Sequence, residues 1–145
     1  MTLLKRAACV SVAVAVGIQF VRRARTNPAT DTSRTLFART QVPPLTAEVL
    51  QRACRDCHSN DTRWPWYSHV APLSWFVIDH VNHGRSHFTY SDWAKYDPPE
   101  AQRLIKKSCE LSRTAEMPLP SYLRLHTDAR LTARDVEALC AWVAP

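Results

Sequence analysis

Apolar residues form one nearly continuous run close to the amino terminus, from Ala7 to Val21. The exceptions within it are Ser11, Gly17 and Gln19. A helix of this run would be about 22 Å long, shorter than the roughly 30 Å apolar layer of a membrane unless neighbouring residues extend it. The run therefore predicts either a membrane anchor or a cleavable signal peptide within residues 1–25.

Basic residues flank the apolar run on both sides, so their distribution gives no orientation across a membrane. Lys5 and Arg6 precede the run, and Arg22, Arg23 and Arg25 follow it. These arginines crowd the positions that a signal peptidase would read, and no small-x-small sequence follows the run. This arrangement favours a retained anchor helix.

The rest of the chain carries apolar stripes at helical spacing and no run typical of a strand. The first stripe follows Thr46, a predicted N-cap, and consists of Val49, Leu50, Ala53, Cys54 and Cys57. Trp64-Pro65-Trp66-Tyr67 is too interrupted by proline to predict a helix. A second helix is expected from about Pro72 to His83, with Gly84 ending it.

Two further helices are indicated by their capping residues. Asp97 is the expected N-cap of the third, which carries the stripe Ala101, Leu104, Ile105 and Ser108. Thr132 and Asp135 predict a capping box for the last helix, whose apolar face is Val136, Leu139, Cys140 and Val143. The whole pattern predicts an all-α fold, a small helical domain preceded by an apolar anchor helix.

The segment between the apolar run and the first stripe has a different composition. Residues 26–43 are rich in Thr, Pro and Arg and show little apolar periodicity, so we expect a flexible tether. Residues 44–145 are enough for one small domain but not for two.

The net charge of +6 is concentrated at the amino terminus. The first 25 residues hold five of the 19 Lys and Arg residues and no Asp or Glu, which leaves 14 basic and 13 acidic residues in the remainder. The basic character therefore belongs to membrane targeting, and a nucleic-acid partner is not supported.

The sequence Cys54-Arg55-Asp56-Cys57-His58 has the Cys-x-x-Cys-His spacing of a c-type haem attachment site. Positions i, i+3 and i+4 lie on one face of a helix, so two thiols and one imidazole can meet the same porphyrin. Cys54 and Cys57 would form thioethers, and His58 would bind the iron.

Two other uses of this spacing are less well supported. A structural zinc site needs four ligands, and no second Cys-x-x-Cys pair is present to complete one with Cys54 and Cys57. A thioredoxin-type dithiol follows a strand in a βαβ pattern, and no such alternation is visible.

The sixth iron ligand is expected to be Met117, the only methionine besides Met1, which lies in a proline-rich loop 59 residues after His58. Imidazoles are rival ligands, and His126 is the strongest of them. The others are His69, His80, His83 and His87. If Gly84 interrupts the second helix, a second metal site built from His80, His83 and His87 is not favoured.

Aromatic and basic residues after the motif are further candidates for haem contact. Trp64 and Trp66 are expected to wall the haem, and Arg63 to bond a propionate. Cys109 and Cys140 lie on the stripes of the third and last helices and would either pair in an oxidising compartment or remain buried free thiols.

These residues together resemble a family of small bacterial membrane-anchored haem-binding domains related to c-type cytochromes. The resemblance is carried by the following segments: Ile18-Gln19-Phe20, Cys54 to Ser68, Ala71 to Trp75, Asp79-His80-Val81, and Glu116-Met117-Pro118-Leu119 with Tyr122 and His126. It implies one covalently held c haem in a cytochrome-c-like helical domain, with Cys54, Cys57 and His58 as its attachment and proximal residues.

The expected function is one-electron transfer by a membrane-tethered monohaem cytochrome, with no enzymatic activity. Because c haem is attached after export, the expected location is the periplasmic face of the inner membrane, with redox proteins as partners. The alternative is a haem-based sensor or small peroxidase-like enzyme whose sixth iron position is open or displaceable.

Overall fold

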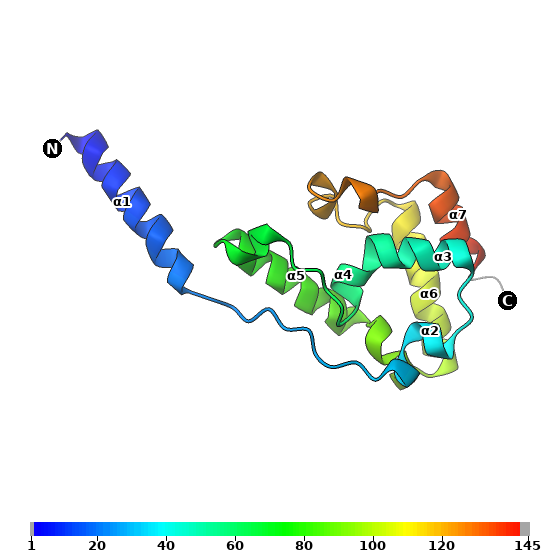
Figure 1. The fold of residues 1–145 in the computed structure, drawn as a ribbon. Coiled ribbons are helices and arrows are strands. Elements are labelled where there is room, and N and C mark those ends of the chain that lie inside the picture. Colours follow the sequence, from blue (N-terminus) through cyan, green and yellow to red (C-terminus); the bar gives the residue numbers. More distant parts are fainter. Residues whose placement is uncertain (1, 143–145) are drawn as a thin grey trace.

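Helices are the regular elements throughout residues 2–142, the part of the chain that the computed structural model describes, and no strand occurs among them. The α-helices are α1 Leu3–Gly17, α2 Leu36–Arg39, α3 Pro44–Val49, α4 Arg55–His58, α5 Leu73–His87, α6 Pro98–Arg113 and α7 Ala133–Ala141. Figure 1 shows α1 standing apart from the other helices, which pack together. The prediction of an all-α fold with an apolar helix at its amino terminus is confirmed.

Short helices connect these elements. They are the 3₁₀ turns η1 Ile18–Phe20, η2 Thr32–Arg34, η4 Trp66–His69, η5 Tyr90–Lys95, η6 Tyr122–Arg124 and η7 Thr127–Ala129, and the π-helical segment η3 Leu50–Cys54. No helix was predicted at Trp64-Pro65-Trp66-Tyr67, but η4 begins at Trp66. Pro65 is the N-cap of this turn, so the missing amide hydrogen of proline breaks no helical hydrogen bond.

The hydrophobic core joins elements that are distant in the sequence. Its buried members are Leu36, Val49, Leu50, Tyr90, Trp93, Leu104 and Leu139. The predicted stripes supply four of them, and the predicted caps at Asp97 and at Thr132 with Asp135 are confirmed. Val143, the last residue of the predicted face, lies outside the described residues.

The predicted N-cap at Thr46 is wrong. α3 begins at Pro44, which fits the first helical position because proline has no amide hydrogen to leave unpaired there. Thr46 is instead fully buried inside the helix, and its hydroxyl donates to the carbonyl of Ala138 in α7 at 3.1 Å.

The predicted end of a helix at Gly84 is also wrong, because α5 continues to His87. Gly84 has no positive φ that would require glycine. A Cβ atom at this position would lie 2.6 Å from the carbonyl oxygen of Cys57 and 3.1 Å from its Cβ. The glycine therefore permits a close approach of α5 to α4, rather than a turn.

The segment expected to be a flexible tether lies against the domain. Leu36 is 0% exposed and belongs to the core. The guanidinium of Arg25 donates to the carbonyl of Ser68 at 2.8 Å, and Arg85 donates to the carbonyl of Thr26 at 2.8 Å. The amide of Asn27 donates to the carbonyl of Thr62 at 2.9 Å. One buried leucine and a few separate hydrogen bonds produce no apolar periodicity, so the sequence pattern did not predict these contacts.

The apolar helix extends further than the run that predicted it. From Leu3 to Phe20 it comprises 18 residues, which is long and apolar enough to cross a membrane by length and composition alone. At about 1.5 Å per residue this span is roughly 27 Å. None of its residues is buried against the domain, and a signal sequence would pass the same test.

A disulfide joins Cys109 of α6 to Cys140 of α7. The two Cα atoms are 4.9 Å apart, and 31 positions separate the residues in sequence. Of the two possibilities that the sequence left open, the structure has the paired one. The bond ties the last helix to the core helix before it.

Removing this disulfide in a Cys109→Ala/Cys140→Ala variant is expected to destabilise the domain by about 3–4 kcal/mol, because the closed loop restricts the unfolded chain. For a domain of this size, the melting temperature should fall by roughly 15 °C. Thermal unfolding followed by circular dichroism measures the change. Cys9→Ala is the matched control, because Cys9 is a free and exposed thiol outside the domain. An unchanged melting temperature in the double variant would contradict the stabilising role.

Candidate functional site

The Cys-x-x-Cys-His motif lies at the end of a helix that changes its winding just before the motif. α3 continues into η3 and then into α4, so the chain is helical from Pro44 to His58. Short π-helical segments often occur at functional sites, since the additional residue rotates the following side chains about the helix axis. The helix ends at His58, and the backbone of Ser59 is extended.

Cys54, Cys57 and His58 line one cavity of about 370 Å³, and most of the surface that encloses it is apolar. The volume is within the roughly 300–1,000 Å³ that ligand-binding pockets usually have. Met117 and Leu119 contribute to the same cavity from the loop that follows α6. The structure thus brings the attachment motif and the predicted sixth ligand together around one partly open cavity.

The ring of His58 is held in one orientation by Phe88. The Nδ1 atom lies 3.2 Å from the carbonyl oxygen of Phe88, and the two rings stack with centroids 4.1 Å apart and planes at 14°. Because a carbonyl only accepts, Nδ1 carries the hydrogen and Nε2 keeps its lone pair. Burial lowers the pKa of His58. The ring is therefore in the neutral form that binds a metal.

Both motif cysteines are free thiols in the structure. Burial raises the pKa of Cys54 and that of Cys57 to about 11. At neutral pH the two side chains are thus protonated S–H groups that line an apolar cavity, not thiolates arranged for disulfide exchange.

The rival ligand His126 has other partners. Its Nε2 atom is hydrogen-bonded to the hydroxyl of Tyr67 at 2.6 Å, and its ring stacks on Tyr122 with centroids 4.0 Å apart. His126 lines an adjoining cavity of about 200 Å³ and not the one that contains His58 and Met117. The geometry therefore favours Met117 over His126 as the sixth ligand.

Three histidines of α5 also line the first cavity, namely His80, His83 and His87. Because α5 is continuous through Gly84, the Nε2 atoms of His83 and His87 lie 3.0 Å apart. His80 donates from Nδ1 to the carbonyl of Phe76 in its own helix at 2.8 Å. No group of three potential metal ligands occurs among residues 2–142. His69 is exposed and lines neither cavity.

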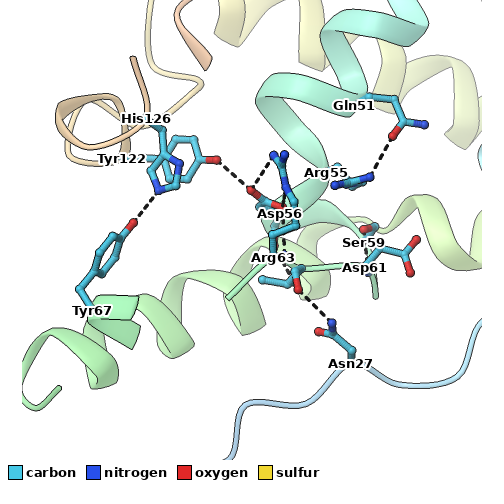
Figure 2. Close-up of polar contacts among 11 residues, drawn as sticks. Asn27, Gln51, Arg55, Asp56, Ser59, Asp61, Arg63, Tyr67, Tyr122 and His126 are labelled. Atoms are coloured by element: carbon cyan, nitrogen blue, oxygen red, sulfur yellow. Dashed lines mark hydrogen bonds and ion pairs between the residues drawn. The ribbon is translucent and has the colours of Figure 1, made fainter. Parts of the chain in front are cut away.

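Asp56, the buried residue between the two cysteines, joins the attachment helix to two loops (Figure 2). It accepts hydrogen bonds from the backbone N–H and the Nε of Arg63, at 3.1 and 3.2 Å, and forms an ion pair with this guanidinium. The hydroxyl of Tyr122 donates to Asp56 at 3.0 Å. Burial, followed by the charge of Asp56, raises the pKa of Tyr122, so the phenol stays protonated and donates.

Figure 2 shows this chain of contacts continuing from Tyr122 through His126 to Tyr67. The contacts fix the loop that carries Met117 against α4 on one side and against η4 on the other. Neither Asp56 nor Tyr67 was among the residues predicted to form the site. The position of Asp56 inside the motif was the one signal in the sequence, and no partner for its carboxylate was predicted.

The remaining predicted contact residues are distributed differently from the expectation. Arg63 lines the adjoining cavity while paired with Asp56. Trp64 donates from its indole N–H to Asn27 at 3.1 Å, and Trp66 is exposed. Neither tryptophan lines either cavity. The walls come instead from α5 and from the loop after α6.

The residues present fit a haem. Two unpaired thiols and an imidazole with a free Nε2 share an apolar cavity with a thioether, which is a donor set that haem iron and its vinyl groups accept. The adjoining cavity shares Asp56, Cys57, His80, Leu119 and Tyr122 with the first, so the two lie side by side.

Residues 13–145 match a family model described as a haem-binding domain. No curated protein and no solved structure matches the chain. The matched region includes residues 13–17 of α1 as well as the whole of the region that carries the two cavities.

Proposed function

Because the chain belongs to the haem-binding domain family, we propose that it is a membrane-tethered cytochrome that carries one c-type haem and transfers single electrons outside the cytoplasm. The observation that carries the proposal is the joint position of Cys54, Cys57 and His58 on one apolar cavity, with Nε2 of His58 free. The Cys109–Cys140 disulfide supports an oxidising compartment.

Cys54 and Cys57 would hold the haem by thioether bonds, each S–H adding across one vinyl group, and His58 would bind the iron through Nε2. When bound, the haem supplies a reversible one-electron couple. The chain's own residues orient His58 through the carbonyl of Phe88 and enclose the site with apolar side chains. A fixed ligand set of this kind suits electron transfer, and we propose no reaction in which a substrate bond is made or broken.

The N-terminal helix supports the membrane part of the proposal. Its 18-residue apolar span matches an anchor in length and composition, and the residues after it lie against the domain rather than forming a long free linker. The domain would thus stay close to the outer face of the inner membrane, where redox proteins of the membrane are its expected partners.

Met117→Ala is expected to remove the sixth ligand and leave the covalent haem in place. A thioether ligand stabilises ferrous iron and raises the reduction potential. Its loss should lower the midpoint potential by on the order of 100 mV, a fraction of the roughly 0.8 V that axial ligands span. Optical spectra of the ferric and ferrous protein and a redox titration measure both effects, and the ferric sulfur-to-iron band at the red end of the spectrum should disappear.

Carbon monoxide separates the two functional classes: the wild-type ferrous protein should not bind it, and Met117→Ala should. A wild-type protein that binds carbon monoxide readily would favour the sensor or peroxidase-like alternative. An unchanged spectrum in Met117→Ala would move the sixth ligand to His83, His87 or His126.

A further inference from the structure

An exposed apolar patch surrounds the start of α5. The patch consists of Trp66, Val70, Leu73, Phe76 and Leu125, which are 76%, 43%, 51%, 50% and 63% exposed. Leu73, Phe76 and Leu125 line the same cavity of about 200 Å³, so the loop that carries Leu125 lies beside α5. A cluster of large apolar side chains on a small domain marks a surface that meets another apolar phase.

The end of the apolar N-terminal helix is bound to the same part of the domain. The side chain of Gln19 donates to the carbonyl of Ala71 at 3.1 Å and accepts from the amide of Ala71 at 3.0 Å. The indole N–H of Trp75 donates to the carbonyl of Val21 at 2.7 Å. In Figure 1 the start of α5 is the part of the domain nearest to the end of α1.

These contacts fix the height of the patch relative to a bilayer that α1 crosses. Gln19 is the last polar residue of the 18-residue span, and Phe20 and Val21 follow it as exposed apolar residues. Ala71 is thus held at the level where the span leaves the hydrocarbon layer, and Val70 and Leu73 lie within two residues of it. Arg22 and Arg23, both exposed, lie at the same level, where anionic headgroups would be met.

We propose that the patch rests in the outer interfacial layer of the bilayer that α1 crosses, with Trp66, Val70 and Leu73 among the lipid headgroups and upper acyl chains. The inference rests on the membrane anchoring in the proposed function. Tryptophan is enriched at this depth because its apolar ring and its polar N–H suit the two sides of the boundary. The cavity beside the attachment site then opens towards lipid rather than towards bulk water.

A second copy of the chain is a less suitable occupant. Gln19 and Val21 already contact the edge of the patch within the same chain. A second copy of the chain would therefore have to bind between this edge and the surface of the bilayer. Lipid requires no such complementarity, since burial of apolar area alone stabilises the contact.

Nitroxide labels in the full-length, haem-loaded protein test the proposal in vesicles of phosphatidylethanolamine and phosphatidylglycerol. In a Cys9→Ala background, with Cys54 and Cys57 bonded to haem and Cys109 bonded to Cys140, a single introduced cysteine is the one free thiol. Val70→Cys reports on the patch, and Glu137→Cys on the exposed face of α7 is the matched control. The ratio of collision rates with oxygen and with a water-soluble nickel chelate should be several-fold higher at residue 70 than at residue 137.

A label at Val14→Cys, in the middle of α1, separates the failure of this inference from the failure of anchoring. If the label at residue 14 collided mainly with oxygen and the label at residue 70 collided mainly with the nickel chelate, the inference would be overturned and the anchor would stand. Water-like collisions at residue 14 would overturn the anchor itself. Dipolar broadening between labels at residue 70, in sparsely loaded vesicles, would show a second copy as the occupant and would also overturn the inference. In a variant that also carries Trp66→Glu, the label at residue 70 should collide less with oxygen and more with the nickel chelate.

Discussion

A variant in which Cys54 and Cys57 are both replaced by alanine is expected to contain no covalently bound haem, whereas the wild-type chain is expected to carry one haem per molecule. Each thiol can form one thioether, so the double variant retains only the non-covalent contacts of the cavity and the bond to His58. Acidified acetone should extract the haem of the variant completely and leave that of the wild type on the chain. Intact-mass spectrometry of protein made in a host equipped for cytochrome maturation measures the difference.

Cys9→Ala is the control for this variant, since it removes a free thiol outside the cavity and should keep the full haem mass. The single variants Cys54→Ala and Cys57→Ala each retain one thiol and should keep a haem bound by one thioether. The interpretation would collapse if the wild-type chain weighed only as much as its amino acids and both motif thiols reacted with an alkylating reagent.

Gly84→Val is expected to destabilise the domain by about 3 kcal/mol or more, out of the roughly 5–15 kcal/mol that hold a domain folded. The new Cβ would lie 2.6 Å from the carbonyl oxygen of Cys57. The atom it meets belongs to the backbone, so relief requires α4 and α5 to separate, and α4 carries Cys57 and His58. Chemical unfolding followed by circular dichroism measures the loss, and a lower haem content should accompany it.

Gly17→Val is the matched control for Gly84→Val, because no atom lies within 4 Å of a Cβ at Gly17. The unfolding of the domain should be the same as in the wild type. Gly84→Ala should fall between the two, since alanine gains about 1 kcal/mol of helix propensity but meets the same carbonyl. If Gly84→Val unfolded at the wild-type denaturant concentration, the close packing of α4 on α5 would not limit stability.

Local patterns in the sequence predicted most of the fold. Helix stripes and caps depend on residues within a few positions of each other, so Asp97 and the pair Thr132 and Asp135 could be identified without knowledge of their neighbours in space. The motif Cys54, Cys57 and His58 was equally readable, because its chemistry requires a fixed spacing along one helical turn. Haem binding, which this motif predicted, is confirmed by the family match.

The wrong predictions concern positions whose conformation depends on contacts with distant parts of the chain. Gly84 looks like a helix stop when read alone, but it serves a contact with Cys57, 27 positions earlier. Thr46 looks like an N-cap, but its hydroxyl bonds to Ala138 in the last helix. Residues 26–43 look unstructured, but Leu36 is part of the core. None of these partners is visible from the neighbouring sequence.

The partner of Nδ1 of His58 could not be predicted for a further reason. It is the backbone carbonyl of Phe88, and every residue type provides that group. Side-chain identity therefore carries no information about it. Asp56 differs, since its side chain is distinctive, but its role became clear only once Arg63 and Tyr122 were seen to converge on it.

The disulfide between Cys109 and Cys140 means that the two pairs of cysteines in this chain require opposite redox conditions. Cys109 and Cys140 are oxidised in the structure, whereas the proposed haem attachment requires Cys54 and Cys57 to stay reduced until both have reacted with vinyl groups. Two cysteines three positions apart close a small ring readily, so an oxidant acting on the newly exported chain would join them too. The proposed haem attachment therefore requires either a reductant that acts on Cys54 and Cys57 but not on Cys109 and Cys140, or delivery of haem before the chain is oxidised.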